Sequence, residues 1–256
     1  MVSAFRHLVL ALVVGALPSV AAPLTVTNLP VADAFVRAAT PGLNYGGAGS
    51  LSVSGPSATN AAGFANGAFD TLIRFSMSGA VSVFDSTFGP GNWVFSAATL
   101  WLTEQAAPAN TNFNRGTGSF EIRWMNADGW VEGTGNPNSP TTDGVTYNDL
   151  PALLNPGNDV SLGTFSNAGL NALQAFPLPL SHPNFVNDMA QGNEVSFYLT
   201  AVTAHIGFTF HSRNSSSAGS RPFLTLTAVA VPEPASVGLL GLGLAGLGFA
   251  RGRLRD

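Results

Sequence analysis

Along most of the chain, short stretches of β-branched and aromatic residues alternate with polar residues, and clusters of Gly, Pro, Asn and Ser separate them. Within one such stretch Thr71, Ile73 and Phe75 would share one face of an extended strand, while Leu72 and Arg74 would share the other. A series of such stretches is typical of an all-β sandwich or barrel. We predict strands over residues 24–28, 33–38, 50–54, 71–77, 97–103, 119–126, 160–165, 194–201, 206–212 and 223–229.

Helical signals are weak. Residues 166–175 begin with a serine that could serve as an N-cap, and residues 184–191 are long enough for two turns. The sequence shows no internal repeat and no linker of domain length before Ala230. We therefore expect one β domain with long loops over residues 23–230.

The N-terminus has the pattern of a signal peptide. A short basic segment over residues 1–6 precedes an apolar run over 8–17, and Pro18 and small residues follow. The apolar run is too short to span a bilayer, which disfavours an uncleaved anchor. We expect residues 1–22 to be a signal peptide with cleavage after Ala21 or Ala22.

The C-terminus carries a Pro-Glu-Pro motif, an uncharged stretch over 235–250 rich in Leu and Gly, and then three arginines. Arginines directly after an apolar stretch stay in the cytoplasm, which places everything upstream outside. The stretch has 16 residues, of which five are glycine, so we expect a temporary transmembrane helix over 235–250. The residues of this signal are Pro232, Glu233 and Pro234, followed by Arg251, Arg253 and Arg255.

This tail, residues 231–256, closely resembles the PEP-CTERM sorting signal of Gram-negative bacteria that make extracellular polysaccharide. The resemblance implies recognition by an exosortase-type membrane protease near Pro232 to Pro234. It also implies attachment to the membrane through the C-terminal helix before processing, and a final location at the cell surface or in the extracellular matrix.

Composition narrows the range of partners. The chain contains no cysteine and no lysine, and residues 23–231 hold six arginines against twelve acids, a net charge of −6. Without cysteine the exported domain uses neither disulfides nor thiol chemistry. Phosphate binding needs clustered positive charge, so nucleic acid is not an expected partner. We predict no cofactor, with a structural Ca²⁺ as the one alternative that the loops suggest.

Several segments between Asp33 and Ala228 resemble the DNRLRE family, which comprises disaggregatase-related, non-catalytic modules akin to a carbohydrate-binding module family. The resemblance implies a single β-sandwich of jelly-roll type. The family often has Trp where this chain has Tyr147, and Arg where it has Leu150. The matching segments lie at residues 33–37, 44–46, 71–75, 98–102, 130–135, 143–151 and 221–224.

Two interpretations of the segment that starts at Trp130 remain open. Trp130 and Glu132 can pin a folded loop through ring packing and hydrogen bonds, which is the favoured interpretation. Alternatively, exposed aromatic rings form a platform for a sugar. Tyr45 and Trp93 lie in Gly-rich segments where we expect exposure, whereas Trp101 and Trp124 lie within strands and are expected in the core. The candidate ligand-binding residues are Tyr45, Trp93, Trp130 and Tyr147.

Support for catalysis or a metal is limited. Two carboxylates across a cleft would suit glycoside hydrolysis, but sequence spacing alone cannot bring them together. No histidine spacing resembles a zinc motif. Oxygen-rich loops could hold Ca²⁺, although their residues are also ordinary turn formers. The residues concerned are Glu104, Glu121, Asp128 and Glu132 as acids, His182, His205 and His211, and Asp143, Asn148 and Asp149 for Ca²⁺.

The sequence thus predicts a non-enzymatic exported matrix or surface protein that binds polysaccharide. A purely structural matrix protein without a ligand site is the first alternative. A polysaccharide-degrading enzyme is the second, and it would require two carboxylates with raised pKa values in a cleft.

Overall fold

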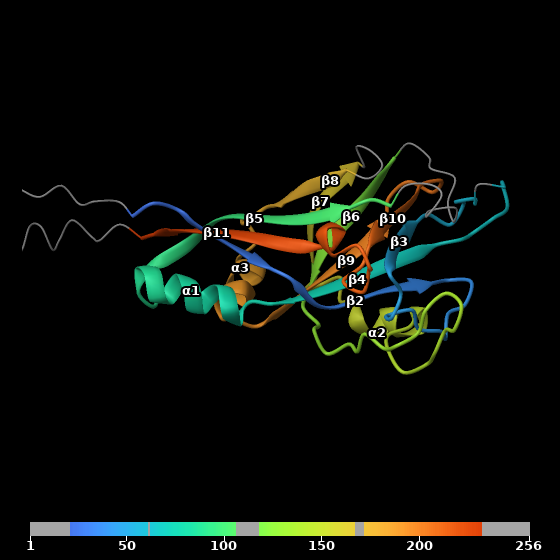
Figure 1. The fold of residues 1–256 in the computed structure, drawn as a ribbon, viewed down its shortest axis with the longest axis horizontal. Coiled ribbons are helices and arrows are strands. Elements are labelled where there is room, and N and C mark those ends of the chain that lie inside the picture. The colour runs from blue at the N-terminus through green and yellow to red at the C-terminus, as the bar shows by residue number, and fades with distance from the viewer. Residues whose placement is uncertain (1–20, 61, 106–117, 167–171, 232–256) are drawn as a thin grey trace, which may run out of the picture. The chain divides into compact units, whose positions relative to one another are not determined.

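Two antiparallel β-sheets pack face to face in the described part of the chain, and the two longer helices lie towards one end of them (Figure 1). The structure is a computed structural model that describes residues 21–60, 62–105, 118–166 and 172–231. The compact unit spans Pro23–Val231. The expected signal peptide, apart from Ala21 and Ala22, and the expected transmembrane helix lie outside the described residues.

The two sheets differ in size. Sheet A has the strand order β1-β11-β5-β8, and sheet B has the order β10-β3-β4-β9-β6-β7 with β2 paired to β4. The strands of sheet A are β1 (Leu24–Asn28), β5 (Trp93–Thr103), β8 (Leu173–Leu178) and β11 (Phe223–Ala230). Those of sheet B are β2 (Pro30–Arg37), β3 (Ser50–Ser54), β4 (Phe69–Ser76), β6 (Ser119–Met125), β7 (Val160–Ser166), β9 (Glu194–Ala201) and β10 (Gly207–His211).

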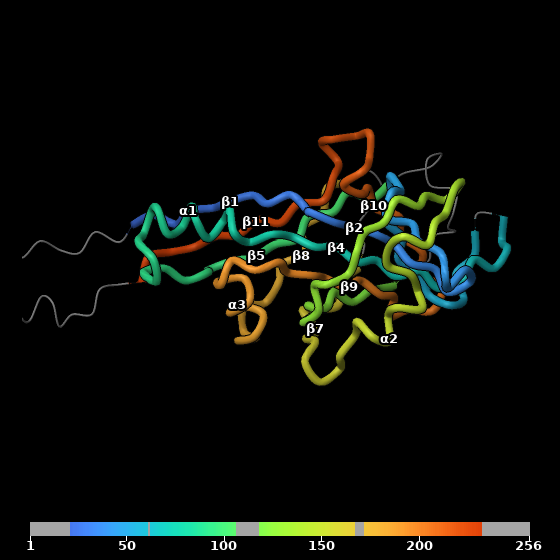
Figure 2. The backbone as a smooth tube through the Cα atoms, turned by 90° about the horizontal axis from the view of Figure 1, so that it is seen from below, coloured from blue at the N-terminus to red at the C-terminus, as the bar shows by residue number. Residues whose placement is uncertain are grey.

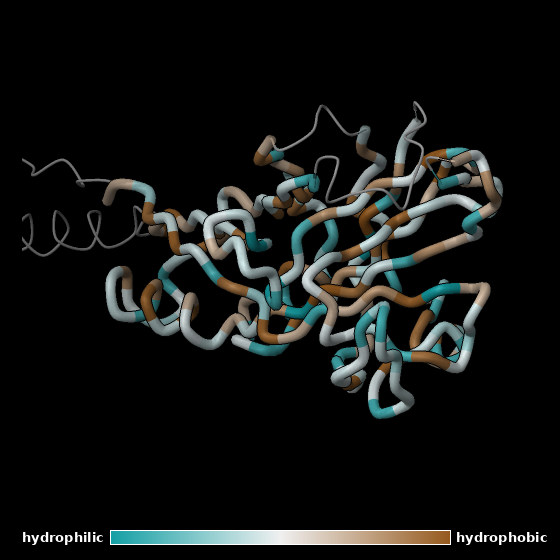
Figure 3. The backbone as a smooth tube through the Cα atoms, turned by 45° about the vertical axis from the view of Figure 1, so that its right-hand side comes forward, coloured by the Kyte–Doolittle hydropathy of each residue, from teal (hydrophilic) through white to brown (hydrophobic). Residues whose placement is uncertain are grey.

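The main core lies between the sheets, where strand alternation directs apolar side chains inward. Figure 3 shows hydrophobic positions, in brown, recurring along the strands. Phe120 alone contacts four other phenylalanine rings, and aromatic pairs of this kind favour edge-on and tilted contacts. The buried side chains at its centre include Ile73, Phe75, Leu100, Leu102, Phe120, Ile122, Phe176, Phe197, Phe210, Leu224 and Leu226.

Sheet B is also covered on its outer face. A second apolar cluster joins Ala34 and Leu72 of this sheet to Trp130, Val145 and Leu150 of a long loop. That loop contains the short helices η1 (Tyr147–Asp149) and α2 (Leu150–Leu153). The residues of β4 are therefore almost all buried, whereas those of β1 alternate between half-buried and exposed.

Two longer helices pack at the end of the sandwich where β1 begins and β11 ends (Figures 1 and 2). Helix α1 (Ser78–Phe88) contacts β1, β5 and β11 of sheet A, whereas α3 (Pro183–Ala190) contacts β9 of sheet B. Helix α1 buries Ala80 and Phe84, and α3 buries Phe185 and Met189. Helix α1 was not predicted, because its Gly, Ser, Val and Thr residues are weak helix formers and packing stabilises the helix. A further short helix is η2 (Ala218–Ser220).

The structure agrees with the prediction of an all-β sandwich, and every predicted strand is present. The two helical turns expected over 184–191 are confirmed by α3. The weak helical signal over 166–175 is wrong at both ends of that range, because Ser166 ends β7 and Leu173 begins β8. Gln174, Phe176 and Leu178 alternate inward in β8, a period of two that a helix does not use.

Candidate functional site

The expected exposure of Tyr45 and Trp93 is wrong, since they are only 6% and 9% exposed. The Tyr45 ring stacks on Phe35 with 4.7 Å between centroids. Trp93 begins β5, packs 5.0 Å from the Phe84 ring and donates a 2.7 Å hydrogen bond from Nε1 to Asp85. Glycines near an aromatic residue mark a turn of the chain, and here the turn folds the ring inward.

Trp130 is buried and holds its loop against sheet B. Its Nε1 donates to Ser196 Oγ at 3.0 Å, and the Arg74 guanidinium lies over the ring, 5.0 Å from the centroid. Arg74 Nη1 also donates to the Trp130 carbonyl at 3.0 Å. These contacts support the pinning interpretation of Trp130. Tyr147 is half-buried against the same cluster, and burial, together with the nearby Asp70, raises the pKa of its hydroxyl.

Glu132 belongs to a charged group with Asp33 and Arg213. Glu132 Oε2 accepts a 2.6 Å hydrogen bond from Arg213 Nη1, and Oε1 accepts one from the Asp33 amide. Asp33 is fully buried, and its Oδ2 accepts from the Arg213 amide at 2.6 Å. Burial, reinforced by the Glu132 charge, raises the pKa of Asp33 to about 7. A raised pKa is a feature of catalytic acids, but a carboxyl with no exposed surface cannot meet a substrate.

Asn44 joins three loop segments, a role that sequence reasoning missed. Its Nδ2 donates to the carbonyls of Glu132 and Val145 at 2.7 and 2.8 Å, and its Oδ1 accepts from the amides of Gly46 and Gly135. Gly133, with φ of +77°, lies so close to the Asn44 amide that any Cβ would collide with it. The only sequence signal was the Asn-Tyr-Gly segment itself, which does not reveal the partners.

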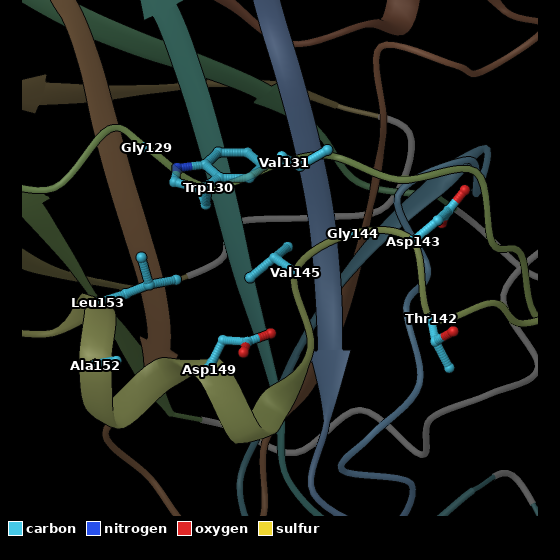
Figure 4. A pocket seen from close by; sticks show the side chains of 10 residues that line it. All are labelled: Gly129, Trp130, Val131, Thr142, Asp143, Gly144, Val145, Asp149, Ala152 and Leu153. Atoms are coloured by element: carbon cyan, nitrogen blue, oxygen red, sulfur yellow. The ribbon is translucent and has the colours of Figure 1, made fainter.

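A cleft of about 430 Å³ lies beside this loop, between residues 129–131, residues 142–145 and the η1–α2 turn (Figure 4). Trp130, Val145 and Leu153 supply apolar wall, and Asp149 supplies a carboxylate. That carboxylate already accepts hydrogen bonds from the Thr146 amide and hydroxyl. Ligand sites usually combine an apolar wall with convergent polar groups, and here those groups are used to fold the loop.

The loop acids considered for Ca²⁺ make turn contacts. Asp143 accepts hydrogen bonds from the Thr134 amide and from the Thr134 and Thr141 hydroxyls, which lower its pKa to about 2. The Asn148 amide donates to the Pro41 carbonyl. Within the described ranges, no group of three His, Asp or Glu side chains is placed to hold a metal ion.

The remaining acids and histidines lie on separate elements. Glu104 is buried, and its backbone forms an isolated antiparallel β-bridge with Phe210. The Glu121 carboxylate forms an ion pair with Arg123 at 3.6 Å. Burial raises the pKa of Asp128 to about 6. His182 precedes α3, His205 lies near the Ser57 carbonyl, and His211 ends β10 with its Nδ1 2.8 Å from Ser215 Oγ.

The outer face of sheet A carries hydroxyl and aromatic side chains. None of its four strands contains a charged residue or a histidine. Strand register places Thr25 opposite Thr227, and Thr27, Thr225 and Thr99 side by side on three neighbouring strands. Thr25 and Thr27 are exposed and the other three are half-buried. We call this surface, with Trp101 and Phe223, the threonine face.

An aromatic pair lies at the far end of the threonine face. Trp101 and Phe223 are register partners on β5 and β11, and their rings stack with 5.6 Å between centroids and 11° between planes. Both are half-buried, so the expectation that Trp101 belongs to the core is wrong, while Trp124 is buried as expected. Trp101 Nε1 donates to Thr225 Oγ1 at 2.9 Å, which fixes the indole against the threonine row.

The family described as the PEP-CTERM protein-sorting motif matches residues 230–253. No curated protein matches the chain. PEP-CTERM signals are recognised by exosortase, a membrane enzyme, so this is an exported protein that exosortase sorts and that the membrane holds before processing. Among the helices of the described segments, none is long and apolar enough to cross a bilayer.

Proposed function

We propose that this protein is a non-enzymatic component of the cell surface or extracellular matrix that binds neutral polysaccharide through the threonine face. The observation that carries the proposal is the stacked Trp101–Phe223 pair beside a row of hydroxyls on a sheet without charge. Aromatic rings pack against the apolar faces of sugars, and threonine hydroxyls exchange hydrogen bonds with sugar hydroxyls.

The absence of charge favours a neutral polymer. A polyanion would need arginine or lysine at the contact, and a polycation would need acids, but the strands of sheet A supply neither. The resemblance to DNRLRE modules and their jelly-roll topology belongs to the same proposal. It supports carbohydrate recognition without assigning residues to it.

Affinity for a single site is expected to be low. One aromatic ring in contact with a sugar contributes about 1 to 2 kcal/mol at about 25 cal/mol per Å² of buried apolar area. Many copies displayed on one repeating polymer would gain avidity without stronger contacts. Display of many copies at the cell exterior would therefore suit this mode of binding.

Affinity electrophoresis through gels that contain neutral polysaccharide from the producing strain tests the proposal. We expect retention of the wild type and a loss of roughly 5- to 30-fold in affinity for Trp101→Ala, which corresponds to the contribution of one ring. Phe64→Ala is the matched control, since this ring is 71% exposed and lies in a loop away from sheet A.

Two results would contradict the proposal. If the wild type is not retained by any neutral fraction, the purely structural alternative is favoured. If retention is unchanged in Trp101→Ala, the ligand binds elsewhere, and the loop cleft beside Trp130 becomes the next candidate.

A further inference from the structure

Both ends of the compact unit leave the sandwich from one end (Figures 1 and 2). Leu24 at the start of β1 pairs with Ala228 near the end of β11. The turn over residues 89–92, between α1 and β5, lies at the same end, and the Val231 amide donates to the Asn92 carbonyl at 2.8 Å. We call this surface, which includes Val94, the terminal end.

The terminal end is apolar. Val94 and Val231 are 52% and 42% exposed, and Val94 pairs with Val229 across the strands. A groove of about 340 Å³ adjoins them, lined by apolar residues such as Pro90, Trp93 and Leu180. Asp85 is the one ionisable residue in this lining, and it accepts the hydrogen bond from Trp93.

The length of the chain keeps the terminal end close to the membrane. The last strand ends at Ala230 and the apolar stretch of the sorting tail begins at Ala235, five residues later. Five residues span at most about 18 Å when fully extended. While the tail is held in the bilayer, the nearest part of the folded domain is therefore within that distance of the lipid.

The distribution of charge also favours contact of the terminal end, and not of other surfaces, with the membrane. Residues 23–231 carry a net charge of −6, so anionic headgroups repel the domain as a whole. The terminal end has little charge to be repelled, and the exposed Val94 and Val231 side chains gain free energy when lipid covers their apolar surface. A tether this short also raises the effective concentration, so a weak contact is populated.

We propose that the terminal end is a bilayer-contact surface of the membrane-held precursor. Val94, Val231 and the 89–92 turn lie in the headgroup region, and the groove beside Trp93 receives apolar lipid groups. The occupant of this surface is thus the lipid of the membrane that holds the tail.

Because the chain has no cysteine, single-cysteine labelling gives an unambiguous test. The full-length precursor would carry a nitrobenzoxadiazole dye at Val94→Cys or, as control, at Phe64→Cys in the loop between β3 and β4. It would be reconstituted in vesicles of phosphatidylethanolamine and phosphatidylglycerol that contain nitroxide-labelled lipid. We expect several-fold stronger quenching at position 94 than at position 64. Equal quenching at both positions would overturn the proposal.

A second measurement tests whether the apolar surface itself attracts lipid or whether the short tail alone keeps it close to the bilayer. With the dye at Asn92→Cys, the additional change Val94→Asp should lower the quenching several-fold, while the circular dichroism spectrum stays that of the parent. Unchanged quenching would mean that the apolar surface makes no contribution, and quenching that requires added exosortase would assign the surface to protein instead of lipid. Either result overturns the proposal.

Discussion

Replacement of Asp33 by Asn should remove most of the pH dependence of stability between about pH 4 and 7. Asp33 is fully buried, its Oδ2 accepts a hydrogen bond from the Arg213 amide, and its Oδ1 has no hydrogen-bond partner among the described residues. Burial is the main cause that raises its pKa from 3.8 to about 7. The folded state therefore prefers the protonated carboxyl.

The sign and size of the effect follow from linkage. The pKa of Asp33 is higher in the folded state than in the unfolded state. The contribution of Asp33 to stability is therefore greatest below about pH 4, falls as the pH rises towards 7, and is constant above that value. The shift of about three pH units corresponds to roughly 4 kcal/mol in the free energy of unfolding. Asn cannot ionise, so the variant should lack this decline, although other titrating groups such as Asp128 still contribute.

Urea denaturation of the purified protein, followed by circular dichroism across this pH range, measures the difference between wild type and Asp33→Asn. The matched control is Asp143→Asn, because the exposed Asp143 has a pKa lowered to about 2 and its contribution to stability is lost only below about pH 4. If the curves for wild type and Asp33→Asn stay parallel from pH 4 to 7, the assigned ionisation of Asp33 is wrong.

Asn44→Ala should lower the free energy of unfolding by about 3 to 5 kcal/mol, because several buried backbone groups lose their partners; a loss below about 1 kcal/mol would contradict this role. Trp130→Ala should cost about 3 to 5 kcal/mol through the cavity that it leaves, measured by the same denaturation, and an unchanged midpoint would refute the pinning interpretation. Mass spectrometry of the exported protein should find an N-terminus at Ala22 or Pro23, and a chain that begins at Met1 would exclude signal cleavage. In a strain without exosortase the protein should keep its tail and stay in the membrane fraction, whereas identical processing in both strains would rule out this protease.

Alternation along the chain was sufficient to predict most strands, because period two is a direct consequence of extended backbone. It could not predict which face of a strand is covered. Trp101 lies between Leu100 and Leu102 in β5, so its side chain points to the opposite face of the strand. In a sheet covered on both faces the ring would be buried, but sheet A is covered on one side only. Tertiary arrangement, absent from the sequence pattern, decides that the ring faces outward.

Elements that depend on distant contacts were missed. Helix α1 forms where Ala80 and Phe84 pack against the core, and its residues have little helix preference of their own. Buried loops were misjudged for a similar reason, since the Gly-rich surroundings of Tyr45 indicate a turn but not the Phe35 ring that covers it. Prediction of the sorting tail succeeded because its motif is contiguous and needs no tertiary partner.

Because both termini of the exported domain leave from the same end, its two ends are not equivalent. Removal of the expected signal peptide or of the sorting tail would therefore shorten the chain at this end only, and neither step would change the surface that carries Trp101. Along β5, Trp101 lies seven residues from Val94, a separation of about 23 Å along the strand at about 3.3 Å per residue. If the terminal end contacts the bilayer as proposed above, neighbouring copies would present their Trp101–Phe223 pairs at a similar distance from the membrane surface.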